Sequence, residues 1–483
     1  MDSAMDATSL LVIVTCSTLL ATVLSVLIAK TVNSGKGKNL PPGSLGLPVI
    51  GQTFEFLRAH KNNTINDWME QKVAKYGFVF KTSLMGCPTV VVIGQEGNRF
   101  LFHNDCNTIA NKQPTTVSRI LGKKNILELN GEDHKRMRGA ILQFLKPEAL
   151  QKFVERMDFV IQQHFVDCWE GKECITVLPL TKTVTFRVAC DMFFSLKDSK
   201  ETDILGKDFT EALKGVWSLP LNLPGTAFHG GLKARSRICK RLSSLLQVRR
   251  GSLDEGNSSP DKDLMSCMLS MRDENGNGFT EEEIIDNVMA VMSAGHETTY
   301  TLLVHLVRLL ALNPDVYHKV YEEQMKVLAG KQSHESLKWV DIQKMKYTWK
   351  VAQETLRLTS PIVGGFKKAI QNVEFASYTI PKGWQFFWSA TSTHMNKEIF
   401  KEPKKFDPSR FESSVPPYSY TVFGGGPRIC PGYDFTRMET LIYMHHLLCN
   451  YKWSLVDPHE IIVCDPVPLP VRGLTIKLQA IHS

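Results

Sequence analysis

One long helical segment constrains the fold of this chain more than any other feature. Residues 281–312 place apolar side chains on most faces of a helix, Thr280 and Glu283 form a capping box at its start, and Asn313-Pro314 ends it. At 1.5 Å per residue such a helix is about 48 Å long, which is the width of a large domain. Because it is apolar nearly all round, it must be covered on all sides, and we expect it to cross the centre of the body.

The rest of the sequence predicts a single, mainly α domain with a minor β sheet. Short β-like runs lie near residues 79–83 and 89–93, and a second helix over residues 346–358 ends at Ser360-Pro361. No internal repeat occurs, and no stretch after residue 51 has the composition of an interdomain linker. We therefore expect one helical domain over residues 52–483.

The amino-terminal segment predicts a transmembrane helix. Residues 7–29 contain no charged side chain, and a helix needs roughly 20 apolar residues to cross a bilayer. A cleaved signal peptide is the alternative, but its apolar stretch is about 7–15 residues long and follows basic residues, whereas Asp2 and Asp6 stand here. Lysines follow the segment instead, so the positive-inside rule places the remaining chain in the cytosol. We expect a membrane anchor over residues 1–30 and a basic, Pro-rich spacer over residues 31–51.

Composition and charge exclude several classes of protein. The net charge is +8, and no basic stripe is interleaved with aromatic residues, which argues against a nucleic-acid partner. The 11 cysteines are odd in number and form no CxxC pair, so neither a disulfide scaffold nor a zinc module is expected. This cysteine usage is typical of a reducing compartment. The positive charge is compatible with an acidic protein partner or an anionic membrane surface.

The segment FGGGPRICPG, residues 423–432, carries the clearest chemistry. A thiolate is a strong, soft ligand for iron when it is deprotonated and shielded from water. Three consecutive glycines let the backbone turn sharply and approach a flat cofactor, and backbone amides near the sulfur can donate hydrogen bonds to it. These properties fit Cys430 as an iron ligand. The alternative is a glycine turn followed by a buried structural cysteine.

The same segment matches the pattern Phe-x-x-Gly-x-Arg-x-Cys-x-Gly at every fixed position and resembles the cysteine-loop signature of the cytochromes P-450. The resemblance implies a cytochrome P-450 fold that holds haem b, an iron protoporphyrin IX, with Cys430 as the axial ligand to the haem iron. It also implies that Arg428 pairs with a haem propionate and that Phe423 packs beside the sulfur. An electron-rich thiolate in this position favours cleavage of the O–O bond.

The segment AGHETT, residues 294–299, resembles the oxygen-activating segment of the same family and lies in the middle of the long helix. The resemblance implies that Ala294 and Gly295 leave room for O2 and that Glu297 and Thr298 relay protons. A carboxylate and a hydroxyl in the middle of a buried helix are costly unless they are hydrogen-bonded or functional. The alternative is an ordinary polar patch on a partly exposed helix. Many relatives carry Asp where Glu297 stands.

Three residues match the ion-pair network of the family. Glu354 and Arg357 are three residues apart, which places them on one face of a helix, and Arg410 follows in the segment Pro-Ser-Arg-Phe. The resemblance implies a structural role for this network behind the haem. A Glu–Arg pair at this spacing is also common on helix surfaces.

Three further residues are candidates for holding the haem. His134 and Arg138 are four residues apart and therefore face the same side of a helix, although the family usually has Trp in the place of His134. Lys367 stands where relatives often have Arg. Its ammonium is a point charge and cannot donate two parallel hydrogen bonds to a carboxylate as a guanidinium does. A purely structural role is an equal alternative for His134 and Lys367.

The expected substrate pocket is apolar. Its candidate residues come from the long helix and from the loop after Pro361, namely Ala290, Val291, Ala294, Ile362, Val363 and Phe366. Such side chains suit a substrate that is held by shape, and they equally suit core packing.

Other passages resemble the plant branch of the family that oxidises terpenoids, which includes triterpene oxidases and taxane hydroxylases. They are KPEALQ at 146–151, MKYTW at 345–349 and IPKGW at 380–384. The resemblance implies a monooxygenase of the endoplasmic reticulum membrane that receives electrons from NADPH through NADPH-cytochrome reductase. Its expected substrate is a small apolar, polycyclic molecule, a di- or triterpenoid, into which one atom of O2 is inserted. A haem-thiolate isomerase or dehydratase that acts on peroxides without a reductase is the alternative, but such relatives tend to lose the Thr that this chain keeps at 298.

Overall fold

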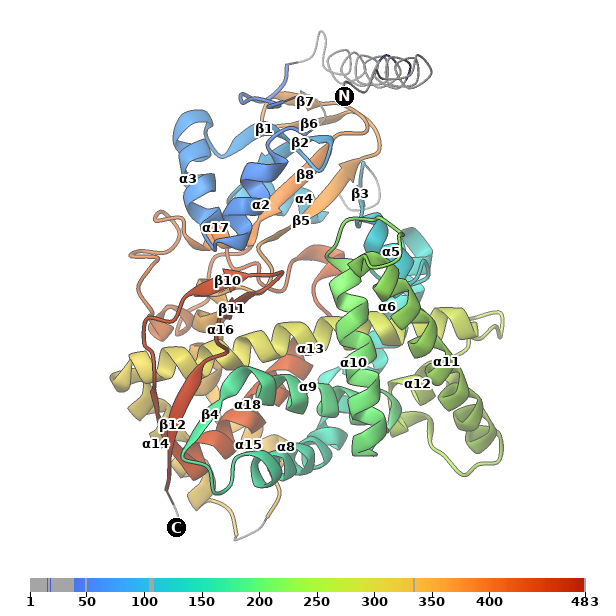
Figure 1. Cartoon of the computed structure of the whole chain (residues 1–483), viewed down its shortest axis with the longest axis vertical. Helices are drawn as coiled ribbons and strands as arrows, with labels where there is room; N and C mark the ends of the chain where they lie inside the picture. The colour runs from blue at the N-terminus through green and yellow to red at the C-terminus, as the bar shows by residue number, and fades with distance from the viewer. Residues whose placement is uncertain are drawn as a thin grey trace, which may run out of the picture.

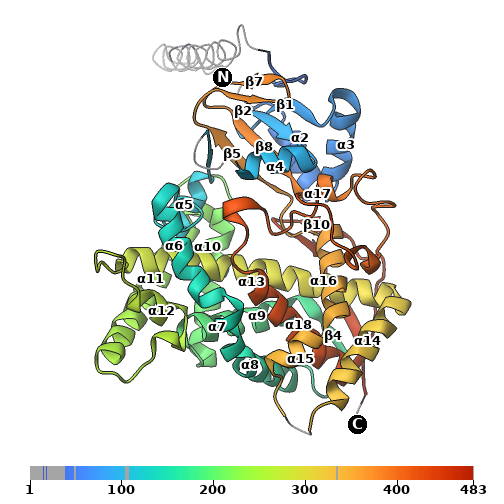
Figure 2. The ribbon, with the colours of Figure 1, turned by 180° about the vertical axis from the view of Figure 1, so that it is seen from behind.

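The computed structural model describes residues 15, 18, 39–47, 50–103, 108–332 and 335–481. Helices dominate it, which confirms the mainly helical fold (Figures 1 and 2). In chain order they are α2 (Thr53–Lys61), α3 (Ile65–Tyr76), α4 (Gln95–His103), α5 (Thr115–Leu121), α6 (Gly131–Leu145), α7 (Pro147–Leu150), α8 (Val154–Cys168), α9 (Val177–Phe194), α10 (Ser199–Val216), α11 (Ala227–Asp254), α12 (Leu264–Ser270), α13 (Glu281–Leu312), α14 (Pro314–Ala329), α15 (Trp339–Lys344), α16 (Lys346–Leu358), α17 (Ala390–His394) and α18 (Tyr433–Asn450).

The minor sheet has the strand order β1-β2-β8-β5-β3, in which only β2 and β8 are parallel. A smaller sheet has the order β4-β12-β9, and two hairpins pair β6 with β7 and β10 with β11. The strands are β1 (Val79–Leu84), β2 (Cys87–Val92), β3 (Ile109–Asn111), β4 (Cys174–Thr176), β5 (Gly364–Ala369), β6 (Val373–Phe375), β7 (Tyr378–Ile380), β8 (Gln385–Ser389), β9 (Tyr451–Leu455), β10 (Ile462–Cys464), β11 (Pro468–Pro470) and β12 (Thr475–Ala480).

Helix α13 has the predicted bounds and crosses the middle of the molecule (Figure 1). Its capping box is formed, because Thr280 Oγ1 accepts from the Glu283 backbone at 3.2 Å and the Glu283 carboxylate accepts from the Thr280 backbone at 2.8 Å. Helix α13 packs on α9, α16 and α18. Most of its residues are buried, except in a short central stretch where the side chains are exposed or half-buried. This central stretch, residues 294–298, belongs to the candidate active site.

The first two strands differ slightly from their predicted bounds. The runs expected at 79–83 and 89–93 are strands β1 and β2, and β2 begins two residues earlier than predicted. The reason is the turn between them, where Met85 and Gly86 adopt left-handed backbone angles, φ +52° and +74°. So tight a turn lets pairing extend down to Leu84 and Cys87.

The expected transmembrane segment at residues 7–29 lies outside the described residues, except for Thr15 and Thr18, which are helical. In the part of the chain that the structure describes, no helix combines the length and apolar character needed to cross a bilayer. The prolines Pro41 and Pro42 of the spacer lie against β1, because the Lys81 backbone donates to the Pro42 carbonyl at 2.8 Å and Lys81 Nζ donates to the Pro41 carbonyl at 2.9 Å.

Candidate active site

The cysteine loop is a tight turn that ends at the start of α18. The turn η4 (Gly426–Arg428) lies at its centre, and Gly424 and Gly426 have φ angles of +72° and +65°, which side chains other than glycine rarely adopt. The Cys430 backbone donates to the Phe423 carbonyl at 2.8 Å and closes the loop. Figure 2 shows this loop in orange-red between the sheet and α13. The sulfur is therefore presented by a backbone with little freedom.

Two of the three glycines make their close contacts with α4. A Cβ atom at Gly425 would lie 2.5 Å from the ring of Phe102, and one at Gly426 would overlap the Phe102 carbonyl. The close approach that the structure shows at these glycines is to Phe102, and their approach to a flat cofactor stays a prediction. Sequence reasoning missed this residue, since nothing in the local pattern connects it to the loop.

The surroundings of Cys430 act on its protonation in opposite directions. Burial raises the pKa of the Cys430 thiol, and the backbone N–H of Gly432 and the positive charge of Arg138 lower it. A thiol in such a position loses its proton when a metal cation coordinates the sulfur.

Two guanidinium groups stand near this sulfur. Arg428 donates to the Leu129 carbonyl at 2.8 Å and to Asn130 Oδ1 at 2.9 Å. Burial lowers the pKa of Arg138, the Cys430 sulfur raises it, and the charge of Arg428 lowers it. Within the described residues, no hydrogen bond or ion pair reaches the half-buried Arg138 side chain. A guanidinium in that situation fits an anionic group of a ligand, such as a haem propionate.

The residues present also fit a haem, an iron cofactor in which the porphyrin supplies most of the iron ligands. No group of three or more His, Cys, Asp or Glu side chains that could bind a metal occurs in the described ranges. An iron held by a macrocycle needs one further protein ligand of the kind that the Cys430 sulfur would offer.

The other haem candidates are placed by different elements. His134 is buried on α6, one turn before Arg138. Lys367 is buried on β5, opposite Asn111 of β3 and Phe386 of β8. A propionate contact for either residue stays a prediction.

Phe423 lies on the side of the loop that faces the helical core. Its ring packs edge-on against Tyr433 with 4.9 Å between ring centres, and the Tyr433 hydroxyl accepts from Trp349 Nε1 at 3.0 Å. This stack connects the first residue of the loop with α16 and α18. It supports the expected role of Phe423 in shielding one side of the loop from water.

The middle of α13 borders open space. Ala294 is exposed although Met292, Ser293 and Thr299 are buried, and a Cβ atom at Gly295 would meet nothing within 4 Å. An exposed alanine at the centre of a buried helix indicates a gap in the packing of the core. The room expected at Ala294 and Gly295 is therefore present.

Glu297 and Thr298 make their hydrogen bonds to different partners. Thr298 Oγ1 donates to the Ala294 carbonyl at 2.8 Å, one turn back along α13. Burial raises the pKa of Glu297 to about 7, and a hydrogen bond from the Trp217 side chain and the charge of Lys182 act against this rise. A carboxyl group with this pKa exchanges its proton readily near neutral pH. No sequence signal pointed to Trp217 or Lys182.

The candidate pocket residues divide into two groups. Ala294 and Ile362 are exposed and Val291 is half-buried, which suits a lining role. Ala290 is only 2% exposed and does not reach the open space, so its expected role in the lining is corrected. Val363 and Phe366 are half-buried and pack against the core cluster around Phe387, consistent with the packing alternative.

The residues of the expected ion-pair network are in contact and deeply buried. Arg357 donates to both oxygens of Glu354, at 2.7 and 2.8 Å, and both side chains are fully enclosed. Arg410 in the turn η3 (Pro408–Phe411) donates to Glu354 Oε1 at 3.3 Å. The surface alternative for Glu354 and Arg357 is therefore wrong.

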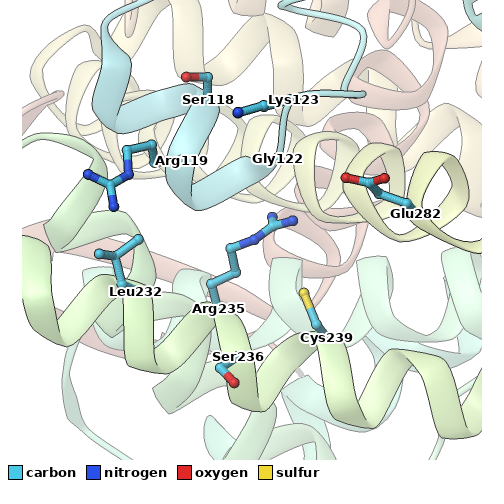
Figure 3. Close-up of a pocket in the computed structure, with 9 residues that line it drawn as sticks. All are labelled: Ser118, Arg119, Gly122, Lys123, Leu232, Arg235, Ser236, Cys239 and Glu282. Carbon is cyan, nitrogen blue, oxygen red and sulfur yellow. The ribbon is translucent and has the colours of Figure 1, made fainter.

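A separate hollow of about 500 Å³ lies between α5, α11 and the start of α13 (Figure 3). Arg235 from its wall pairs with the buried Asp286 at 2.6 Å. Its lining is Ser118, Arg119, Gly122, Lys123, Leu232, Arg235, Ser236, Cys239 and Glu282. None of these residues belongs to the cysteine loop or to the central stretch of α13.

Comparison with known proteins gives one consistent result. The family model described as Cytochrome P450 matches residues 41–476. A beta-amyrin 28-monooxygenase of Medicago truncatula is 42% identical over 442 residues, which cover 91% of this chain and 92% of that protein. A taxane 10-beta-hydroxylase of Taxus cuspidata is 40% identical over 451 residues, which cover 92% and 91%. The structure of a retinoic acid-bound cyanobacterial CYP120A1 matches with a TM-score of 0.83 and 29% identity, over 92% of this chain and all of that one.

These matches span nearly the whole chain, and they agree with the cysteine loop and the open centre of α13. The chain therefore belongs to the cytochrome P450 family of monooxygenases.

Proposed function

We propose that this protein hydroxylates an apolar polycyclic terpenoid, with electrons from NADPH delivered by NADPH-cytochrome reductase. Relatives that match most of its length are named as a beta-amyrin 28-monooxygenase and a taxane 10-beta-hydroxylase. The observation that carries the proposal is the open space beside Ala294, since a rigid apolar substrate needs a gap of this kind next to the reacting centre.

Membership of the family implies haem, O2 and electrons from a reductase, and we propose haem b as the form bound. The bound haem supplies the chemistry that inserts one oxygen atom into a C–H bond. Cys430 is the residue whose sulfur would bind the haem iron, and Arg138 and Arg428 would pair with the propionates. The loop glycines and Phe423 keep Cys430 in place and shielded.

Glu297 and Thr298 are proposed to deliver protons. The Thr298 hydroxyl stands beside the open space, one turn from Ala294, and the Glu297 carboxyl takes up and releases a proton near neutral pH. Ile362 is 38% exposed and offers apolar surface without charge, so the substrate would be held by shape.

The isomerase or dehydratase alternative has less support. The chain keeps both the acid and the alcohol of the proton-delivering pair, and the relatives named above are oxygen-inserting enzymes. We also propose that residues 1–30 anchor the enzyme in the endoplasmic reticulum with its catalytic domain in the cytosol. That arrangement rests on the uncharged segment and the lysines after it.

The test is turnover by the whole chain in yeast microsomes with a plant NADPH-cytochrome reductase. Beta-amyrin and a taxane are the probes, and products are identified by mass spectrometry. We expect a product that carries one added oxygen and that depends on NADPH. Thr298→Ala should keep the haem but release reducing equivalents as peroxide, whereas Thr299→Ala serves as the control, because the neighbouring Thr299 is buried and its hydroxyl has no partner among the described residues.

Two results would contradict the proposal. Conversion of a peroxide in the absence of reductase, without NADPH-dependent oxidation of either probe, would favour the isomerase or dehydratase alternative. Recovery of the whole chain in the soluble fraction after lysis would contradict the proposed anchor.

A further inference from the structure

The central stretch of α13 has few contacts of its own that fix its position. Its side chains are exposed or half-buried, and it contains Gly295, one of the weakest helix formers. The Thr298 hydroxyl donates to the Ala294 carbonyl at 2.8 Å. The Thr301 hydroxyl donates to the Glu297 carbonyl at the same distance. Because hydroxyls that bond one turn back weaken and often bend a helix, the place of this stretch depends on neighbouring elements.

His296 makes a polar contact between this stretch and α9, which runs beside α13 (Figures 1 and 2). Its Nδ1 lies 2.8 Å from Thr185 Oγ1. Among the described residues, this is the only hydrogen bond between a side chain of α9 and a side chain of α13. Thr185 is only 1% exposed, so bulk water does not compete for the contact. The central stretch is thus joined to α9 at one polar point.

The direction of this hydrogen bond follows from the second partner of the hydroxyl. Thr185 Oγ1 donates to the Thr181 carbonyl at 2.9 Å, one turn back on α9. A hydroxyl has a single hydrogen, so its oxygen must accept from the Nδ1–H of His296. Burial and the charge of Lys182 lower the pKa of His296 to about 3, and the ring is therefore neutral at pH 7. Its one N–H is thus committed to Thr185.

Aromatic side chains on both helices fix the plane of the His296 ring. The ring packs edge-on against Phe186 of α9, with 5.3 Å between ring centres, and against Tyr300 of α13, with 5.0 Å. Tyr300 in turn lies 4.9 Å below the Lys182 ammonium of α9, measured to its ring centre. The imidazole is therefore held at its N–H and by two rings, so a shift of the central stretch relative to α9 would break these contacts.

The residues on either side of His296 are those that border the open space. Ala294 and His296 are two residues apart, about 200° around the helix, so one borders the open space while the other contacts α9. Glu297 and Thr298 follow directly on the same backbone. Their places beside the open space therefore change whenever His296 moves relative to α9.

We propose that His296 is a positioning residue for the monooxygenase reaction, which through Thr185 holds the central stretch of α13 in a fixed place against α9. The contact sets where Glu297 and Thr298 stand beside the open space. His296 acts through these two residues and takes no part in making or breaking bonds. This inference rests on the role proposed above for Glu297 and Thr298 in proton delivery.

Hydrogen exchange of the haem-loaded protein, followed by mass spectrometry, tests the contact without turnover. Thr185→Val keeps the shape of the side chain and removes the oxygen that accepts from His296. We expect amide exchange in peptides that cover residues 294–298 to become about fivefold faster, the factor for the loss of one neutral hydrogen bond. Thr181→Val is the control, because the Thr181 hydroxyl is buried too but donates only to carbonyls of its own helix. Unchanged exchange in Thr185→Val overturns the proposal.

Turnover with beta-amyrin and reductase tests the consequence for proton delivery. We expect Thr185→Val and His296→Phe each to raise the peroxide released per NADPH severalfold, with an unchanged haem content and an unchanged spectrum of the reduced carbon monoxide complex. Thr185→Ser loses the methyl group but keeps the acceptor, so it should behave as the wild type. A role in packing alone predicts the reverse, and more peroxide from Thr185→Ser than from Thr185→Val would overturn the proposal.

A double variant shows whether the two side chains act together. Because Thr185→Val and His296→Phe break the same hydrogen bond, the double variant should release no more peroxide than either single variant. Additive effects would mean that the two residues act separately, and would overturn the proposal. Thr185→Ala also lacks the hydroxyl and replaces Thr185→Val if the latter does not fold.

The outcomes separate this inference from the function on which it rests. If Thr298→Ala releases no more peroxide than the wild type, the role proposed for Glu297 and Thr298 is wrong. If Thr298→Ala releases peroxide but Thr185→Val behaves as the wild type, that role stands and the inference about His296 is wrong. If beta-amyrin is not oxidised, the exchange measurement still decides whether Thr185 holds the central stretch.

Discussion

The guanidinium of Arg138 and the sulfur of Cys430 lie close enough for each group to change the pKa of the other. Arg138 comes from α6 and Cys430 from the turn before α18, so two distant segments meet at this point. Of the two arginines near the sulfur, Arg428 already donates to Leu129 and Asn130, whereas Arg138 has no such partner in the described ranges. Arg138 is thus the arginine of the two whose side chain has its hydrogen-bonding groups left for an anionic part of the haem.

Arg138→Leu should weaken haem binding. Removal of one charge-assisted hydrogen bond lowers the affinity by roughly tenfold. Haem retention is measured as the ratio of haem absorbance to protein absorbance after the sample has been mixed with an apoprotein that captures free haem. Lys135→Leu on the same helix removes an exposed cation that pairs with Glu132, and it should retain haem as the wild type does. Equal retention by Arg138→Leu would exclude Arg138 as a propionate ligand.

Gly425→Ala should destabilise the cysteine loop, because the added methyl group would lie 2.5 Å from the ring of Phe102. Overpacking of this kind costs about 1–3 kcal/mol, measured as a fall in the free energy of unfolding. Phe102→Leu in the same chain should restore part of the loss by removing the ring. Gly139→Ala is the matched control, because a methyl group there meets nothing within 4 Å, and a helical position gains about 0.5–1 kcal/mol from the same change. A Gly425→Ala variant as stable as the wild type would contradict the packing described here.

Arg357→Leu should be among the most damaging substitutions outside the site. It leaves the Glu354 carboxylate fully buried with a hydrogen bond from the Asp407 backbone at 2.9 Å and one long contact to Arg410, and breaking a buried ion pair by removing one partner costs about 3–5 kcal/mol. Arg410→Ala should cost clearly less, because Arg357 would still donate twice to Glu354. Chemical denaturation of both variants measures the difference. A larger loss of unfolding free energy in Arg410→Ala than in Arg357→Leu would show that Arg410 is the main partner of Glu354 and would contradict the prediction.

The free energy of unfolding should depend on pH through the titration of the Glu297 carboxyl. Burial raises the pKa of this carboxyl from 4.5 to about 7 in the folded state, so between these values the folded chain binds more protons than the unfolded one. The contribution of Glu297 to stability is then present below about pH 4.5 and is lost as the pH rises through 7. The free energy of unfolding of the wild type minus that of Glu297→Gln should fall by about 2 kcal/mol between pH 5 and pH 8.

Denaturation midpoints of the two proteins at both pH values provide the measurement. Glu282→Gln, which removes an exposed carboxylate from the start of the same helix, is the control. A difference between wild type and Glu297→Gln that stays constant with pH would show that the Glu297 carboxyl is not held in its protonated form by burial.

The fold was predictable where its determinants are local. The bounds of α13 follow from Thr280, Glu283 and the Asn313-Pro314 pair, all of which act within a few residues of a helix end. The cysteine loop is likewise a contiguous motif, and it led to the correct family. The start of β2 was placed two residues late, because the left-handed conformation of Met85 in the preceding turn has no sequence signal.

The site was predictable only in part, since much of it depends on contacts between distant segments. Nothing near Glu297 in the sequence indicates Trp217 or Lys182, and nothing near Gly425 indicates Phe102. The sequence predicts Ala290 in the pocket together with Val291 and Ala294 of the same helix. The gap in the core is confined to the middle of α13, and the apolar pattern of a helix does not show where along its axis such a gap occurs.

The measurement that tests this account most directly is the difference spectrum of the reduced protein with carbon monoxide, taken for the wild type, Cys430→Ala and Cys239→Ala. Cys239 is half-buried in the separate hollow beside α11 and controls for loss of a thiol as such. We predict the long-wavelength absorbance band of a thiolate-bound haem in the wild type and in Cys239→Ala, and its loss in Cys430→Ala. The same band in Cys430→Ala, or no such band in folded, haem-replete wild type, would contradict the assignment of Cys430 as the haem ligand.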